Sequence, residues 1–529
     1  MDAAIIGGGI AACAVMAGFV KNALRHEPPT EPDPRGVHGD ASIARTEQEI
    51  LHCGLTNKKP GGFYISHVMG GLRFQQETGC LVFGGPGTGK GVGFVITSIL
   101  DRDKTTPESI LCYDPAAQNI FVTGPYLQSI GYRVIYSNLV AEHTPRLLQQ
   151  FGPPVRMNPL TTMSLDHPLI DIEVGETAGL LVPVKPDDKQ PHFAQTAQQL
   201  AAAVALWLRE TEDDKATWVK VAELIHQTPA ALNTMFAGML SSRFPTVRAC
   251  GALWHREIDD KGAMKNSTEG QREVLTTCRR ALSFLLNGAI AQMFSGTGPE
   301  AYNFVDMKRQ RTAYFLVLPE TNNDSLQKCG ALVLQTAKQA LKALQGTEEA
   351  ALSRGDSLTV LWLLDEMAAA LPPAGGAELI QQSAALLRKY KIRIAGISQS
   401  WAQFECWAGG AQKADALKGL MGAAIYYGAN DNTSIAHIMQ ECGSYTDWAP
   451  STNPLDEVGV DGKTSAMKIP LVHPEDLRGM ISQGMQIISL IGSRQIVVLP
   501  RANYRAIPQL RARAAADPYH PEQKPHKEA

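Results

Sequence analysis

Short apolar runs alternate along the chain with stretches in which apolar residues recur at helical spacing. Runs of four to eight apolar residues bounded by turn residues predict strands of a parallel sheet that is buried on both faces. Seven such runs lie at residues 80–83, 109–113, 132–136, 312–319, 358–364, 392–397 and 424–427. Segments with helical spacing of apolar residues follow or separate several of these runs, at residues 94–100, 325–344 and 377–390. This alternation predicts an α/β fold.

The middle of the chain has a different character. Residues 193–292 are rich in Ala, Leu and Gln, and strand-like runs almost vanish there. We expect this segment to form an all-α domain inserted into the α/β fold. The fold would then consist of a first part at residues 61–192 and a second part at residues 293–512.

The first 25 residues allow two interpretations. Residues 3–20 are uncharged and stand between Asp2 and the basic residues Lys21 and Arg25. Their length is marginal for crossing a bilayer. As a membrane anchor, this segment would leave the body of the protein in the cytoplasm, because basic residues favour that side. The alternative is a buried or fraying amphiphilic helix.

Polar segments flank both ends of the predicted core. The stretch after the first segment contains Pro28, Pro29, Pro32 and Pro34, which predicts a linker at residues 26–60. Residues 513–529 are polar and contain His, Pro and Glu, which predicts a disordered tail.

Composition limits the class of protein. With 529 residues, 44% hydrophobic and 19% charged, the chain is folded over most of its length and has two or more domains. The net charge of −3 means that any DNA contact must come from a local surface. Basic clusters at residues 308–311 and 388–393 are interpreted first as ordinary solvated faces or turns. Scattered cysteines without metal-ligand spacing favour a reducing compartment and no zinc site.

A glycine-rich segment follows the first apolar run and precedes a helical one. It matches the first seven positions of the phosphate-binding pattern G-x-x-x-x-G-K-[ST] and comprises Gly84, Gly85, Pro86, Gly87, Thr88, Gly89, Lys90, Gly91 and Val92. Glycines let backbone N–H groups turn toward a β-phosphate, and the lysine brings a charge to the β and γ oxygens. Gly91 stands where a Ser or Thr hydroxyl would ligate magnesium. The segment predicts a site for ATP and Mg²⁺.

Two later strand ends complete this site in the prediction. Asp365 and Glu366 follow the apolar run at 358–364. In nucleotide-driven motors the first carboxylate would hold Mg²⁺ through water, and the second would polarise the attacking water. Gln399 ends the next run, where an amide could sense the γ-phosphate. We therefore take Lys90, Glu366 and Gln399 as the candidate catalytic residues.

These motifs and their order resemble the coupling ATPases of type IV secretion and conjugation, the TraG/TraD-like family. The similar segments run from about residue 60 to 505. They are residues 89–96, 114–115, 158–160, 364–369, 399–403, 427–431 and 470–477. The glycine-lysine-glycine of the phosphate loop is similar to that family's variant, so Gly91 looks like a family trait.

The resemblance implies a RecA-like core that assembles into a homo-hexamer, with nucleotide at the subunit interfaces. It also implies that the all-α insert selects cargo, typically a relaxase bound to single-stranded DNA, or another secreted protein. Components of the secretion channel would be partners at the cytoplasmic face of the bacterial inner membrane. An arginine reaching a neighbour's γ-phosphate is expected, and Arg388 and Arg393 are the candidates.

The chain departs from the family in two places. Members commonly follow the Asp-Pro with Lys-Gly-Glu, whereas this chain has Ala116, Ala117 and Gln118. Members usually carry two transmembrane helices, and this chain has at most one candidate. Two alternatives therefore stay open beside the coupling ATPase. One is a HerA/FtsK-like DNA pump or a secretion ATPase that energises assembly, and the other is a cargo-binding scaffold that does not hydrolyse ATP.

Overall fold

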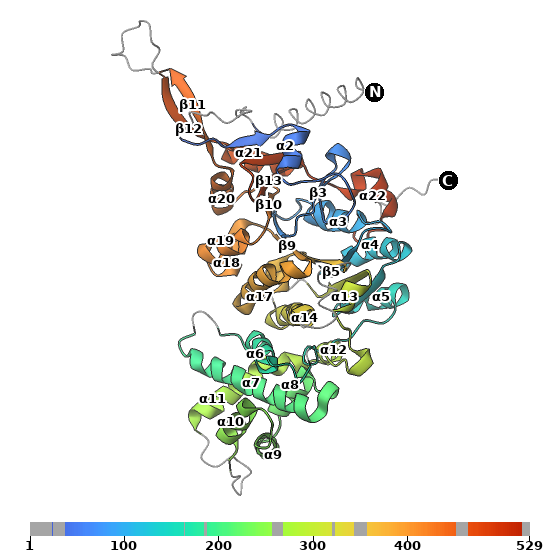
Figure 1. The fold of residues 1–529 in the computed structure, drawn as a ribbon, viewed down its shortest axis with the longest axis vertical. Helices are drawn as coiled ribbons and strands as arrows, with labels where there is room; N and C mark the ends of the chain where they lie inside the picture. The colour runs from blue at the N-terminus through green and yellow to red at the C-terminus, as the bar shows by residue number, and fades with distance from the viewer. Residues whose placement is uncertain are drawn as a thin grey trace.

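The computed structural model describes residue 24 and residues 38–162, 164–184, 188–256, 268–319, 323–342, 357–450 and 464–520. The molecule is elongated (Figure 1), with a central sheet and its helices in the middle, a group of helices at one end and a hairpin at the other. None of the helices in this described part has both the length and the apolar character needed to cross a bilayer. The candidate anchor at residues 1–25 lies outside it, apart from Leu24.

A large mixed sheet forms the centre of the molecule. In the described residues it has ten strands, in the order β1 (Ser42–Ala44), β14 (Gln495–Pro500), β13 (Met485–Leu490), β10 (Ala423–Tyr426), β4 (Cys80–Phe83), β9 (Ile392–Ser398), β8 (Thr359–Leu364), β5 (Glu108–Tyr113), β7 (Thr312–Val317) and β6 (Arg133–Asn138). From β10 to β6 every neighbouring pair is parallel. Strand β13 is antiparallel to both of its neighbours. All seven predicted strands are present within two residues of their expected bounds.

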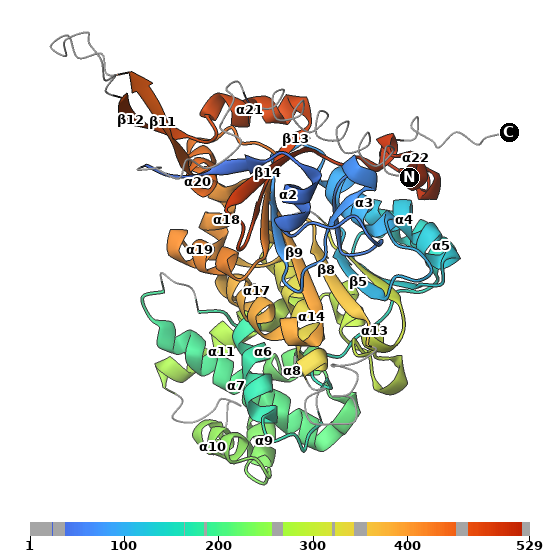
Figure 2. The same ribbon diagram turned by 45° about the horizontal axis from the view of Figure 1, so that its top comes forward.

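Helices cover both faces of this sheet, as Figure 2 shows. In β4, Leu81 and Phe83 point into one core while Cys80 and Val82 point into the other. One face carries α2 (Glu47–His52), α3 (Ile96–Leu100), α4 (Gln118–Ser129), α5 (Thr144–Phe151) and the hairpin of β2 (Phe63–Ser66) and β3 (Leu72–Phe74). The other carries α13 (Asp306–Arg309), α14 (Asp324–Lys342), α16 (Met367–Ala370), α17 (Pro373–Leu387), α18 (Trp401–Ala408), α19 (Ala411–Gly419), α20 (Asn432–Cys442) and α21 (Pro474–Gln483). Burial on both faces explains why these strands are continuous apolar runs.

The all-α part forms a layer of its own below the sheet in Figure 1. It contains α6 (Ile170–Leu181), α7 (Pro191–Glu212), α8 (Trp218–Ile225), α9 (Pro229–Met239), α10 (Pro245–Trp254), α11 (Glu269–Leu282) and α12 (Gly288–Met293). Helix α6 packs both on α7 and on α14 and α17 of the sheet layer. The helical layer therefore begins at Ile170, before the expected boundary at residue 193.

The segment expected to be a linker is structured in its described part. Strand β1 pairs in parallel with β14, with Ser42 opposite Gln495. Helix α2 then begins at a capping box, in which Thr46 and Glu49 each accept the other's backbone N–H. The linker prediction at residues 26–60 is therefore wrong from Ser42 onward. A strand of three residues is too short to give a readable apolar pattern.

The segment expected to be a disordered tail is also structured in part. Helix α22 (Pro508–Arg513) is followed by residues that lie along α4, and the backbone N–H of Ala515 donates to the Val122 carbonyl at 2.8 Å. Asp517, within this segment, is buried. The prediction for residues 513–529 is therefore wrong for residues 513–520, and residues 521–529 lie outside the described part. A few buried contacts order this polar segment, and composition alone does not reveal them.

Candidate nucleotide site

The glycine-rich loop connects the end of β4 to the helix that leads into α3. Gly87 and Gly89 have φ of 73° and 85°, a left-handed conformation that glycine adopts without steric cost. The Lys90 ammonium reaches back across the loop and donates to the carbonyls of Gly84 and Gly85. The loop therefore curves around the lysine side chain. A curved glycine-rich loop of this kind can present its backbone N–H groups to an anion.

Two residues that the sequence analysis did not assign to the site support this loop. Arg501 donates from Nη1 to the Thr88 carbonyl at 2.6 Å, and its guanidinium lies 5.1 Å from the centre of the Tyr427 ring. A side chain at Gly84 would meet the Tyr427 Cβ at 2.9 Å. Since Arg501 follows β14 and Tyr427 follows β10, only the folded sheet brings them to the loop. The family resemblance includes Tyr427 without giving it a role, and no local sequence signal points to Arg501.

The acidic pair follows the end of β8. Glu366 is almost fully buried and has φ of 61°, which is unusual for a residue with a side chain. Asp365 accepts a hydrogen bond from Asn119 Nδ2 at 3.4 Å. Left-handed backbone at a non-glycine residue costs about 1–3 kcal/mol and clusters at functional sites.

A third carboxyl group lies beside this pair. Asp114, at the end of β5, is fully buried and accepts backbone N–H bonds from Asn119 at 3.1 Å and Ile120 at 2.8 Å. Burial raises the pKa of Asp114 to about 7, the two backbone N–H bonds oppose this rise, and the nearby Asp365 carboxylate adds to it. Sequence analysis named Asp114 only through the family resemblance. Its proximity to Asp365 follows from the neighbouring positions of β5 and β8.

The strand register brings the loop, the acidic pair and the glutamine to one edge of the sheet. Phe83 pairs with Ser398, and Leu364 pairs with Gly396. The Gly84 N–H donates to the Ser398 carbonyl at 3.2 Å. Because β4, β9 and β8 are adjacent and parallel, the residues that follow them emerge side by side. This is the arrangement on which the predicted site depends.

Gln399 lies in a turn that is fixed by another glutamine. The Gln403 Oε1 atom accepts the Gln399 backbone N–H at 3.0 Å and the Ser398 hydroxyl at 2.9 Å. Ser400 caps the start of α18 by accepting the Gln403 N–H at 3.1 Å. The turn beside the phosphate loop is therefore held by side chains of the helix that follows it.

The two candidate arginines lie at the opposite end of β9. Arg393 is largely buried, and its Nη1 lies 3.7 Å from a Glu108 carboxylate oxygen. Arg388 pairs with Glu77 at 3.2 Å, and its side chain is 58% exposed. Neither arginine lies beside the phosphate loop or the acidic pair of this chain. A role at a neighbour's site stays a prediction, and exposure favours Arg388.

The residues present fit a magnesium nucleotide. A Cβ atom built on Gly91 would meet no atom within 4 Å, so space is open where the common motif has a hydroxyl. Among the described residues, no group of three or more His, Cys, Asp or Glu side chains could hold a metal by itself. Mg²⁺ commonly binds through one or two carboxylates, substrate phosphates and waters. Asp365 is the carboxylate that would serve it here.

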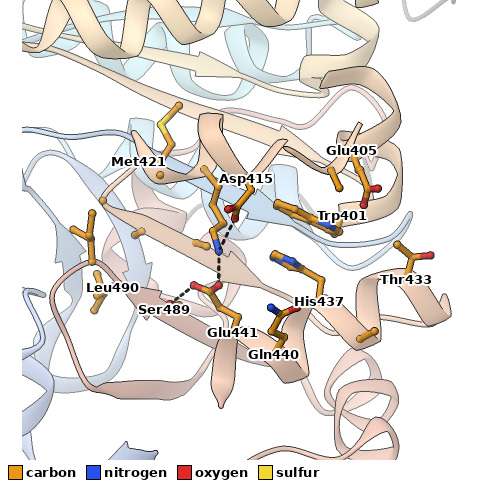
Figure 3. Close-up of a pocket in the computed structure, with 18 of the residues that line it drawn as sticks. Trp401, Glu405, Asp415, Met421, Thr433, His437, Gln440, Glu441, Ser489 and Leu490 are labelled. Atoms are coloured by element: carbon orange, nitrogen blue, oxygen red, sulfur yellow. Dashed lines mark hydrogen bonds and ion pairs between the residues drawn. The ribbon is translucent and has the colours of Figure 1, made fainter. Parts of the chain in front are cut away.

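A separate cavity of about 1110 Å³ lies between α18, α19 and α20 and the strands β10 and β13 (Figure 3). The His437 ring stacks on Trp401 with centroids 3.5 Å apart, and burial lowers the pKa of His437 to about 4. Lys418 pairs with Glu441 and with Asp415. These acidic partners make the cavity a poor match for phosphates. It borders the start of β10, away from the phosphate loop.

Comparison with solved structures finds the same fold in the bacterial conjugative coupling protein TrwB. The unbound form of TrwB lacking its first 70 residues has a TM-score of 0.62 and 14% identity, over 90% of this chain and 97% of that one. TrwB in complex with ADP and Mg²⁺ has a TM-score of 0.61 at 14% identity, over 90% and 96%. These likenesses confirm the predicted RecA-like α/β core with an inserted all-α domain.

Comparison at the level of sequence gives the family. No curated protein matches the chain. The model of the family described as type IV secretory system conjugative DNA transfer matches residues 38–523. The match covers nearly all of the chain, and it confirms the resemblance drawn from the ordered motifs. The chain therefore belongs to the family of type IV secretory system conjugative DNA transfer proteins.

Proposed function

We propose that this chain is an ATP-hydrolysing coupling protein that recruits DNA, as a relaxase–DNA complex, or protein cargo and drives it into a type IV secretion channel. The observation that carries the proposal is the common sheet edge of β4, β9 and β8, where the phosphate loop, Gln399 and the acidic pair emerge together. TrwB, which has this fold, is known in complex with ADP and Mg²⁺ and with an ATP analogue. Both findings support nucleotide use at this edge.

The roles of the residues follow from their chemistry. The loop N–H groups and the Lys90 ammonium bind the phosphates, and the lysine exchanges its carbonyl contacts for phosphate oxygens. Asp365 would hold Mg²⁺, and the bound ion would neutralise charge on the phosphates. Glu366 orients and polarises the attacking water, and burial keeps its carboxylate away from bulk solvent. Gln399 reports the presence of the γ-phosphate to α18.

The partners and assembly are part of the same proposal. A homo-hexamer would place nucleotide between subunits and would multiply a few basic contacts around a central channel. Such multiplication reconciles DNA handling with a net charge of −3. The all-α layer would receive the relaxase, and the site of action would be the cytoplasmic face of the inner membrane.

ATP turnover measured against protein concentration, with and without single-stranded DNA, tests the proposal. We expect turnover per subunit to rise with concentration, because a shared site needs its neighbour, and to rise further with DNA. Absence of phosphate release at every concentration would favour the non-hydrolysing scaffold. That alternative draws its support from Gly91, which has no hydroxyl for the metal.

A second measurement separates the coupling protein from a HerA/FtsK-like pump. A coupling protein should bind a relaxase–DNA complex more tightly than the same DNA without relaxase. Equal affinity for both, together with DNA-stimulated turnover, would assign the chain to the DNA pumps.

A further inference from the structure

The C-terminal strap, residues 501–519, contacts three elements around the nucleotide site. Arg501 donates to the Thr88 carbonyl in the phosphate loop at 2.6 Å. Arg513 donates to the Leu100 carbonyl at the end of α3 at 2.8 Å. Ala515 donates to a carbonyl of α4. The strap therefore joins the phosphate loop and its helix to the helix that follows β5.

The strap ends on the turn that begins α4. Asp517, 6% exposed, accepts a hydrogen bond from Gln118 Nε2 at 2.8 Å and pairs with Arg505 at 2.6 Å. The Tyr519 hydroxyl donates to the Ala116 carbonyl at 2.7 Å. Ala117, between the two contacted residues, has φ of 53°. An unusual backbone conformation is thus held from outside by side chains of the strap.

The residue after this turn, Asn119, contacts the carboxyl groups of the site. Asn119 is 2% exposed, and its backbone N–H donates to the buried Asp114 carboxyl group. Its side-chain Nδ2 donates to Asp365 Oδ2 at 3.4 Å. Two side-chain hydrogen bonds, joined by the backbone between Gln118 and Asn119, therefore connect the strap to Asp365.

We infer that Asn119 is a positioning residue for Asp365 and that the C-terminal strap holds Asn119 in place. The inference rests on the proposed function, because it concerns the carboxylate that would serve Mg²⁺. An amide that donates to one oxygen of Asp365 restricts the rotation of the carboxylate that would serve the metal. The turn with Ala116, Ala117 and Gln118 is therefore held in this chain by contacts from its own C-terminus.

Binding of a fluorescent ATP analogue to the full chain, titrated with Mg²⁺ and repeated in EDTA, tests the inference. Asn119→Ala should raise the Mg²⁺ concentration for half-maximal response at least about tenfold, as expected for loss of a carboxylate-orienting contact. Its affinity for the analogue in EDTA should match the wild type, because the phosphate loop is untouched. Gln128→Ala, at an exposed position of the same helix, is the matched control and should change neither value.

The strap is tested by its own contact. Asp517→Ala and Gln118→Ala should each raise the half-maximal Mg²⁺ concentration about threefold. The double variant Asn119→Ala/Asp517→Ala should behave like Asn119→Ala alone, because the strap acts through Asn119. Additive effects would overturn the role of the strap, and Gln118→Ala keeps this test valid if Asp517→Ala fails to fold.

The outcomes separate the two levels of the argument. If the wild type binds the analogue with a Mg²⁺ response and Asn119→Ala responds identically, the inference is overturned while the proposed function stands. If the wild type itself has no Mg²⁺-dependent binding, the proposed function fails first.

Discussion

The two edges of the parallel strands carry charged residues in very different surroundings. At the amino-terminal edge, Arg102 and Glu108 form a buried pair at 3.0 Å, and Glu108 also accepts the Gly62 N–H at 3.0 Å. At the carboxyl-terminal edge, Lys90 lies in a glycine loop, and the Asp365 carboxylate is close enough to the buried Asp114 to add to the rise of its pKa. Charges at the first edge neutralise each other. Those at the second edge stand where the proposed nucleotide would bind.

Two lysines make the same comparison. Lys308 is 1% exposed and donates to the carbonyls of Leu358 and Tyr390. Burial, with Lys391 nearby, lowers its pKa to about 7. The expectation that residues 308–311 form a solvated basic face is therefore wrong at Lys308. Lys90 also bonds to carbonyls, but it stays partly exposed in an open loop. The buried Lys308 holds neighbouring segments together, whereas the accessible Lys90 can exchange its carbonyl partners for phosphate.

The largest expected effect is at the loop lysine. Lys90→Ala should reduce ATP turnover at least about 10²–10³-fold, because it removes the charge directed at the phosphates. It should also weaken nucleotide binding. Phosphate release by the purified chain measures the first effect, and Lys389→Ala, an exposed lysine at the other edge, is the control. Undiminished turnover in Lys90→Ala would contradict the claim that the carboxyl-terminal edge binds the nucleotide.

Glu366→Gln should lower turnover by a similar factor while nucleotide binding persists, so its total effect is smaller than that of Lys90→Ala. The amide keeps the shape of the side chain but cannot polarise the attacking water as a carboxylate does. Parallel assays of binding and phosphate release separate the two effects. Glu405→Gln, in the cavity of Figure 3, should leave both unchanged. Full turnover in Glu366→Gln would mean that hydrolysis is directed from elsewhere.

At the amino-terminal edge the effect should be on stability. Glu108→Ala leaves Arg102 buried without its carboxylate, and we expect a loss of about 3–5 kcal/mol in the free energy of unfolding. Glu475→Ala, at an exposed position of α21, should cost far less. Urea unfolding measures both. Nucleotide affinity of the Glu108→Ala fraction that remains folded should equal that of the wild type, and a selective loss of affinity would contradict a purely structural role.

The smallest effect on stability is expected at Arg388. Its ion pair with Glu77 is exposed, so Arg388→Ala should change the free energy of unfolding by less than about 1 kcal/mol. Turnover of the same variant decides its candidate role at a neighbour's site. A fall of about 10³-fold would assign the arginine finger to it, since such arginines contribute that much. Unchanged turnover would leave Arg388 as a surface residue.

Sequence patterns predicted the parts of the fold that are buried on both faces. The strands β4, β5, β8 and β9 are continuous apolar runs because helices cover each side, and their order placed the phosphate loop and the acidic pair in one site. The apolar pattern does not reveal a strand that is short and pairs with a strand far away in the sequence. Strand β1 has three residues, and its partner β14 lies more than 400 residues away in the sequence.

The support of the site was not predictable for the same reason. Arg501 reaches the phosphate loop and Asn119 reaches Asp365 from elements that are distant along the chain, and Asp517 contacts Gln118 beside Asn119. Each is an ordinary polar residue in its local sequence. Composition also predicted disorder around Asp517. That prediction failed because one buried ion pair and a few backbone contacts order the segment, and it contains no apolar run that a pattern could reveal.

The central claim is that one magnesium nucleotide binds at the carboxyl-terminal edge, between Lys90 and the acidic pair. A structure of the full chain with a non-hydrolysable ATP analogue and Mg²⁺ tests it most directly. The account predicts phosphates inside the loop of residues 84–91 and the metal on the Asp365 side of them. A nucleotide found in the cavity beside Trp401 and His437, with the loop empty at saturating analogue, would contradict it.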